Sequence, residues 1–324
     1  MDATPNALIR DELNRRRAQL EVAVRTVGRR DELLHLLDEV DAALARIGDG
    51  SYGHCEVCHD PIEPDRLMAD PLLRFCLDHL SPQQRSDLQE DLDLAARIQS
   101  GLLPPRQFQT GSWSAAFRYG PLGAVSGDYC DLLDGGDGSF FFALGDVSGK
   151  GVAASMLMAH LHASIRVLMN SGLGVEEMVK RASRVFCEST LPSHYVTLVC
   201  GHCRPDGKVA LVNAGHVPPM LIQRGAVRPL EATGLPIGLF CQEEFQVRLV
   251  EMAPGDAIVA YTDGLTEVSD GREEFGRERL AQVLAGAEGD SAEDLVLASL
   301  RAADAFRGTR PFTDDLTVLA IRRE

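Results

Sequence analysis

Apolar residues in the first part of the chain recur at helical spacing in two stripes, and charged residues cover the remaining faces. Steps of three and four residues are typical of amphipathic helices. Gly28 separates the stripes, so the pattern predicts an antiparallel helical hairpin over residues 7–47 that turns at Val27-Gly28-Arg29-Arg30. The apolar residues of the two stripes are Leu13, Leu20, Val24, Val27, Leu33, Leu36, Leu37, Val40, Leu44 and Ile47.

A third helical pattern begins at Ser81-Pro82, which suits a cap and a first turn, and ends at Pro104-Pro105. Its apolar seam is heptad-like, with steps of four and three residues. A seam this short is equally compatible with two arrangements. The helix could pack on its own domain, or it could pair with a second copy of the chain. The seam consists of Leu88, Leu92, Ala95, Gln99 and Leu102.

Beyond Pro105 the pattern changes to short apolar runs broken by Gly, Asp and Pro. Longer helical patterns interrupt these runs, and a last strand is predicted at Leu316 to Ile321. The mixture predicts an α+β fold, and the chain divides into residues 1–80, 81–105 and 106–324. The three helical patterns span residues 151–170, 174–190 and 276–306.

Charge and composition narrow the function. The 324 residues include 48 acidic and 32 basic side chains, a formal net charge of -16, which would repel a nucleic-acid backbone. No run of 18 apolar residues and no secretory signal pattern is present. We expect a cytoplasmic protein for which neither nucleic acid nor a membrane is a partner.

The segment 48–80 is rich in Gly, Pro, Cys and His but poor in large apolar residues, so a core of its own cannot hold it. Cys55 and Cys58 are followed, after seventeen residues, by Cys76 and His79. This C-x2-C…C-x2-H spacing predicts one structural zinc ion on four closed ligands. The alternative is a metal-free finger that is held by apolar packing.

A second pair, Cys200 and Cys203, lies in an alternating apolar run without a partner pair. We interpret these two as strand cysteines. The cysteines outside the zinc pattern are expected to act mostly as small apolar residues.

Four aspartates share one local design, in which an apolar strand meets a carboxylate at its edge. If these edges converge, the carboxylates need hard cations to cancel their repulsion, and oxygen ligands suit Mg²⁺ or Mn²⁺. Two such ions can activate a water for in-line attack on phosphorus. Each motif by itself is also typical of a plain turn. The four residues are Asp128, Asp146, Asp263 and Asp314.

Taken together, the runs "VSGDYCD", "LGDVSGKGVAASMLMA", "LVNAGHVPPMLI", "YTDGLTE" and "FTDDLTVLAI" resemble the catalytic domain of metal-dependent PPM phosphatases of the SpoIIE/RsbU type. The resemblance covers residues 106–322. It implies a four-layer α-β-β-α sandwich, protein serine/threonine phosphatase activity, and a phosphorylated anti-sigma-factor antagonist as substrate in a partner-switching pathway. "LDLAARIQSGLLPP" resembles the helix that enters this domain, which implies a homodimer and transmission of a sensor's state to the metal site.

The resemblance also implies a set of metal ligands. Asp146 would be shared by two Mn²⁺ or Mg²⁺ ions. One ion would also bind the Val147 carbonyl and Asp128. The other would also bind Asp263 and Asp314.

Four further residues surround these motifs in the sequence. His216 is either a turn-shaping residue or a proton donor, and Lys150 is either a phosphate contact or a solvent-facing side chain. Ser148 stands where other relatives of the PPM phosphatases carry a histidine, which leaves the general acid unassigned. Asp315 is expected to support the site without binding metal.

The run "ALARIGDGSYGHCEVCHDPIEPDRLMADPLLRFCLDH" resembles the DksA/TraR-type zinc-finger module, with His79 in place of the usual cysteine. That family binds RNA polymerase through an acidic tip, whereas the turn predicted here is short and basic. Two alternatives to a protein phosphatase follow: a non-enzymatic regulator that binds RNA polymerase, and a phosphohydrolase of small phosphates. The non-enzymatic regulator would release no phosphate. The phosphohydrolase would release it from small phosphates and not from a phosphoprotein.

Overall fold

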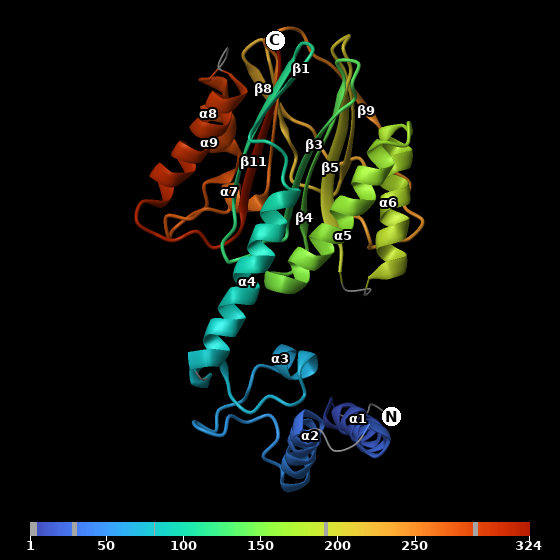
Figure 1. Ribbon diagram of the computed structural model, residues 1–324. Coiled ribbons are helices and arrows are strands. Elements are labelled where there is room, and N and C mark those ends of the chain that lie inside the picture. Colours follow the sequence, from blue (N-terminus) through green and yellow to red (C-terminus); the bar gives the residue numbers. More distant parts are fainter. Residues whose placement is uncertain (1–4, 28–30, 81, 191–193, 288–290) are drawn as a thin grey trace. The chain divides into compact units, whose positions relative to one another are not determined.

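The computed structural model describes residues 5–27, 31–80, 82–190, 194–287 and 291–324, and it divides into two units between Asp91 and Leu92. Figure 1 shows the arrangement of elements within each unit. The units are described separately below.

The first unit is the predicted helical hairpin followed by the cysteine-rich segment. Helices α1 (Pro5–Val27) and α2 (Asp31–Asp49) pack together, and α3 (Pro64–Ala69) and the short helix η1 (Leu77–His79) follow. The predicted turn at 28–30 lies outside the described residues. One core joins the hairpin to the cysteine-rich segment, because both contribute buried residues to it. These are Ile9, Leu13, Leu20, Val40, Ala43, Ile47, Tyr52, Cys55, Ile62, Leu67 and Cys76.

Helix α4 (Pro82–Leu102) belongs to the second unit from Leu92 onward. The predicted cap residue Ser81 is outside the described part of the chain. From Leu92 the seam faces the helix's own domain, and Gln99 is buried there. Leu94 and Ile98 lie on another face and are 48% and 60% exposed.

The second unit contains two antiparallel sheets that pack face to face. The six-stranded sheet has the order β1 (Gln107–Thr110), β2 (Trp113–Gly120), β11 (Leu316–Arg323), β10 (Ala257–Tyr261), β7 (Met220–Gln223) and β8 (Ala226–Pro229). The five-stranded sheet has the order β3 (Asp128–Asp134), β4 (Phe140–Val147), β5 (Val196–Cys203), β6 (Lys208–Ala214) and β9 (Arg248–Glu251). Aromatic and branched residues fill the space between them, which fixes the two sheets against each other.

Helices cover the outer face of each sheet (Figure 1). Helices α5 (Gly151–Met169) and α6 (Val175–Ser189) pack on the five-stranded sheet, and α8 (Gly276–Ala285) and α9 (Ala292–Arg307) pack on the six-stranded one. The predicted α-β-β-α sandwich is therefore confirmed. Helix α5 is long and apolar enough to cross a membrane by length and composition, but its apolar face packs against the sheet.

Three expectations need correction. The helical pattern over 276–306 forms two helices, because α8 ends at Ala285, with Gly286 as its C-cap, and α9 begins at Ala292 behind the N-cap Ser291. The last strand extends to Arg323. Cys187 on α6 forms a disulfide with Cys241, with 5.5 Å between the Cα atoms, so these two are not plain apolar residues. Their separation of 54 residues leaves no local pattern that could reveal the pair.

The packing of α5 predicts that truncation of two methionines changes the free energy of unfolding by very different amounts. Met158 is 1% exposed and Met156 is 68% exposed. We expect Met158→Ala to lower the free energy of unfolding by about 2–5 kcal/mol, because it leaves a cavity against the sheet. Met156→Ala should change it by less than about 0.5 kcal/mol. Urea titration of both variants measures the difference, and equal losses would contradict the assigned buried face.

Candidate functional site

The structure brings the four aspartates to one end of the sandwich. Asp128 begins β3 and lies directly opposite Asp146 of β4 in the five-stranded sheet. Asp263 follows β10 and begins the short helix α7 (Asp263–Thr266), and Asp314 precedes β11, both in the other sheet. Each sheet thus contributes two members. We call Asp128, Asp146, Asp263 and Asp314 the carboxylate cluster.

Two threonines from the six-stranded sheet hold Asp128 across the interface between the sheets. The hydroxyls of Thr262 and Thr317 donate to Asp128 Oδ2 at 3.0 and 2.6 Å. The Thr317 amide donates to Thr262 Oγ1 at 2.9 Å, which fixes the two hydroxyls relative to each other. Asp128 is fully buried, so these charge-assisted bonds determine where its carboxylate points.

Burial and mutual repulsion disfavour the charged form of the cluster. Burial, followed by the charge of Asp146, raises the pKa of Asp128 well above its usual range. Burial, with the charges of Asp263 and Asp314, raises the pKa of Asp146 to about 7. The same two effects raise the pKa of Asp263. Divalent cations would reverse this cost, and an all-oxygen donor set fits Mg²⁺ or Mn²⁺.

The backbone around the cluster leaves no room for larger residues. A Cβ atom on Gly264 would overlap the Asp315 carbonyl oxygen, so only glycine lets the start of α7 approach the segment that precedes β11.

The Asp315 carboxylate accepts the Leu122 amide at 2.6 Å and the Gly127 amide at 3.2 Å. Asp315 therefore holds the loop that leads to Asp128.

Lys150 forms an ion pair with Asp314. Its Nζ donates to Asp314 Oδ2 at 2.8 Å and to the Thr313 carbonyl at 3.2 Å. The carboxylate and lysine together lie at the exposed rim of the cluster. The ion pair is a weak one in solvent, so Lys150 remains available to other anions.

His216 is buried and connects the two sheets through hydrogen bonds. Its ring accepts or donates hydrogen bonds at both nitrogens, with Thr197 Oγ1 2.8 Å from Nδ1 and the Tyr261 carbonyl 3.1 Å from Nε2. Burial lowers its pKa to about 4, so the ring is neutral. Both nitrogens are thus used within the protein, which favours the turn-shaping interpretation over proton donation.

Ser148 is also committed to the backbone. Its amide donates to the Tyr195 carbonyl at 2.9 Å, and its hydroxyl accepts the Tyr195 amide at 3.0 Å. These bonds hold the segment after Val147 against the start of β5. Ser148 therefore shapes the backbone next to Asp146.

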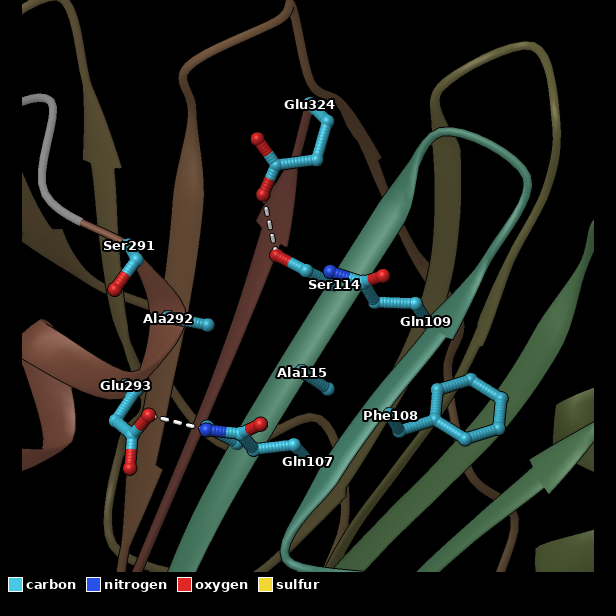
Figure 2. Close-up of a pocket in the computed structure, with 10 residues that line it drawn as sticks. Gln107, Phe108, Gln109, Ser114, Ala115, Ser291, Ala292, Glu293 and Glu324 are labelled. Carbon is cyan, nitrogen blue, oxygen red and sulfur yellow. Dashed lines mark hydrogen bonds between the residues drawn. The ribbon is translucent and has the colours of Figure 1, made fainter.

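A small hollow of about 250 Å³ adjoins the cluster. Its walls are mostly apolar and include Leu92, Leu122 and Val152, and Lys150 and Asp314 stand at its edge. A larger hollow of about 440 Å³ lies elsewhere, between the start of α9 and strands β1 and β2 (Figure 2). No member of the carboxylate cluster lines that larger hollow, so we do not place the site there.

The cysteine-rich segment gathers a second, chemically different ligand set. Potential ligand atoms of Cys55, Cys58, Cys76 and His79 all lie within 4.8 Å of one another. Within the described ranges of the chain, this is the one group of Cys, His, Asp and Glu side chains gathered so closely. Three sulfurs and one imidazole nitrogen suit tetrahedral zinc without an open position.

The backbone also prepares Cys55 for metal. Burial acts to raise the pKa of its thiol, but hydrogen bonds from the amides of Cys58, Cys76 and Val57 outweigh burial and lower that pKa. The thiolate is the form that binds zinc. The local fold thus favours the ligand form of this residue.

Cys200 and Cys203 do not form a comparable site. Both lie on β5, where Cys200 faces the core under α5 and α6 and Cys203 faces the core between the sheets. Residues three apart on a strand point to opposite faces. Their interpretation as strand cysteines is confirmed.

Comparison with known proteins assigns the larger unit. The family described as "Stage II sporulation protein E (SpoIIE)" matches residues 136–324, which is 189 of the 324 residues. The chain belongs to the SpoIIE family. The family described as "Prokaryotic dksA/traR C4-type zinc finger" matches residues 50–78, and His79 lies just beyond that match. Both resemblances that the sequence indicates are confirmed.

Two relatives of this SpoIIE-family chain are similar to it over most of its length. Protein IcfG of Synechocystis sp. is 27% identical over 72% of this chain and 41% of its own length. Phosphoserine phosphatase RsbU of Bacillus subtilis is 24% identical over 74% of this chain and 72% of its own length. The chain therefore spans less than half the length of IcfG.

A solved structure supports the same relationship. The RsbU and RsbW domains of Rv1364c from Mycobacterium tuberculosis are 27% identical, with a TM-score of 0.59. The match covers 68% of this chain and 62% of that one. The sandwich is thus the fold of RsbU-type domains.

Sequence reasoning missed the side chains that hold the SpoIIE-family motifs in place. Thr262 and Thr317 stand within the quoted runs "YTDGLTE" and "FTDDLTVLAI", but only the three-dimensional structure shows that both point at Asp128. Gln99 was assigned to an apolar seam, although a polar residue at a buried seam position is itself a signal of a specific partner. That partner is Ser126.

The ligand geometry predicts one zinc ion per chain. Cys76→Ser should lose this zinc, because serine offers no thiolate to complete the tetrahedron. Cys200→Ala, a cysteine on β5, should keep it. Elemental analysis of the purified full-length variants measures the metal content. Zinc retained by Cys76→Ser, or lost in Cys200→Ala, would contradict the assignment.

Proposed function

We propose that this chain is a metal-dependent protein serine/threonine phosphatase that hydrolyses phosphoserine and phosphothreonine. The observation that carries the proposal is the carboxylate cluster, which both sheets build at one end of the sandwich. One buried and three partly buried acidic side chains that lie close together are costly unless cations neutralise them. The sequence keeps all four within the motifs of the SpoIIE family.

The proposed ligands follow from the strand ends on which they lie. Asp146 would be shared by both ions, as the resemblance to the SpoIIE/RsbU type implies, and the charges of Asp263 and Asp314 both act on it. Asp128 and the Val147 carbonyl would hold one ion, and Asp263 and Asp314 would hold the other. When bound, Mn²⁺ or Mg²⁺ supplies Lewis-acid activation of a water and neutralises phosphate charge.

The chain's own residues supply positioning. Thr262 and Thr317 aim the Asp128 carboxylate, and Asp315 holds the loop that leads to it. Lys150, at the rim of the cluster, can meet the substrate phosphate as a point charge. These contacts are fixed before substrate arrives, so little reorganisation is needed during the reaction.

A protein substrate fits the surroundings better than a small phosphate. The apolar hollow beside Lys150 and Asp314 can take a side chain next to the phosphorylated residue. The relative RsbU is named a phosphoserine phosphatase, and the Rv1364c structure contains both an RsbU and an RsbW domain. The proposed substrate is accordingly an anti-sigma-factor antagonist in a partner-switching pathway.

The remaining parts of the chain are assigned regulatory roles. Residues 1–80 are proposed as a regulatory module with one structural zinc, 81–105 as a linker helix, and 106–324 as the phosphatase domain. Leu94 and Ile98 are exposed on α4 and offer a contact for a homodimer. We place the protein in the cytoplasm, with no role for nucleic acid.

Removal of the shared ligand tests the reaction. We expect Asp146→Asn to lower Mn²⁺-dependent phosphate release from a phosphoprotein by at least about 100-fold, since such charge stabilisation is worth several kcal/mol. Asp134→Asn, at the exposed end of β3, is the matched control and should retain activity. Activity that survives in Asp146→Asn would argue against the two-ion site.

Substrate preference separates this function from the alternatives. Turnover of a phosphorylated antagonist protein should exceed that of nucleoside phosphates by at least about tenfold in kcat/KM, because only the protein can fill the apolar hollow. Phosphate release measures both under the same Mn²⁺ concentration. Preference for nucleoside phosphates would favour a small-phosphate hydrolase, and an inert protein that binds RNA polymerase would favour the DksA-like regulator.

A further inference from the structure

Gln99 makes an unusual set of contacts for a residue on a linker helix. It lies near the end of α4 and is only 5% exposed. Its side-chain Nε2 donates to the Ser126 carbonyl at 2.7 Å, and its Oε1 accepts the Ser126 amide at 3.0 Å. The Tyr119 hydroxyl donates to the same Oε1 at 3.0 Å. The amide thus binds both backbone groups of one residue.

Ser126 connects Gln99 directly to the carboxylate cluster. Ser126 is fully buried, and its hydroxyl oxygen accepts the Asp128 amide at 3.0 Å. The carbonyl of the next residue, Gly127, accepts the Val147 amide at 3.3 Å. Ser126 and Gly127 thus link Gln99 to the backbone amides of Asp128 and Val147, the two residues that are assigned to one ion.

The segment before Asp128 depends on such anchors because it has no regular structure of its own. Residues 121–127 lie between β2 and β3 and form neither helix nor strand. Asp315 holds one side through the amides of Leu122 and Gly127. Gln99 holds the other side, and it is the anchor that α4 provides.

We propose that Gln99 is a positioning residue for the metal site, which fixes Ser126 and thereby the backbone of Asp128 and Val147. The inference rests on the proposed function, since it concerns the same site. A buried amide that satisfies both Ser126 groups fixes that peptide strongly, because losing it leaves a donor and an acceptor unpaired. Loss of the Gln99 amide therefore loosens the backbone of two residues that are assigned to one ion.

Binding of Mn²⁺ to the full-length chain gives a readout that does not depend on activity. We expect Gln99→Leu, which keeps the size but not the hydrogen bonds, to weaken Mn²⁺ binding measured by calorimetry by at least about tenfold. The Mn²⁺ concentration that half-activates phosphatase turnover should rise in parallel. The KM for the phosphoprotein should stay within about twofold, because the substrate does not touch Gln99.

Two further variants make the result specific. Tyr119→Phe removes one bond to Oε1 but leaves the Ser126 clamp, so Mn²⁺ binding should stay within about twofold of wild type. Gln99→Glu keeps the acceptor and loses the donor to the Ser126 carbonyl, so it should fall between wild type and Gln99→Leu. Thermal melting in the presence of a chelator shows whether each variant folds. If Gln99→Leu does not fold, Gln99→Glu takes its place in the Mn²⁺ binding test.

The outcomes separate the two proposals. Unchanged Mn²⁺ binding in a folded Gln99 variant, or an equal loss in Tyr119→Phe, would overturn the positioning role. A wild type that binds Mn²⁺ but releases no phosphate would count against the proposed function alone. In that case, weaker Mn²⁺ binding in Gln99→Leu would still support the role of Gln99.

Discussion

The repulsion between the clustered carboxylates is the constraint on which the phosphatase-like unit depends. Asp128 and Asp146 face each other on neighbouring strands, and the charges of Asp263 and Asp314 act on Asp146 from the other sheet. Such a cluster persists only if the surrounding structure holds the side chains and a cation compensates their charge. The threonine pair, the Asp315 loop contacts and the close approach at Gly264 all serve the first requirement.

Packing far from the cluster also holds the acidic side chains in place. The register of β3 and β4 places Asp128 opposite Asp146, and a slip of one residue would turn both side chains to the other face. Phe140, Phe142 and Leu144 lie in the core between the sheets and prevent such a slip. His216 then ties β5 to the end of β10, so that the two sheets cannot slide apart at the site.

The sequence predicts the parts of this design that are local. Each aspartate is recognisable because an apolar strand stops beside it, and the helices at 151–170 and 174–190 follow from their periodicity. Long-range relations are not readable in this way. The Cys187–Cys241 bond, the aim of Thr317 at Asp128 and the Gln99–Ser126 clamp join segments that only the fold brings together.

The break between α8 and α9 escaped prediction for a different reason. The apolar pattern is continuous from 276 to 306, because both helices pack against the same sheet. Periodicity reports which face is buried, and it does not report where the backbone turns. Gly286 follows the last residue of α8, but a single glycine within a helical pattern is also tolerated without a break.

Two ligand sets of opposite chemistry coexist in one chain, and this separates their functions. Thiolates and an imidazole at Cys55, Cys58, Cys76 and His79 select a soft or borderline ion and leave no open position. Carboxylates select hard ions that exchange and keep water for chemistry. Loss or oxidation of the first site can therefore change the N-terminal unit without removing a ligand of the second. A route from one to the other must be mechanical, and α4 is the covalent connection between the units.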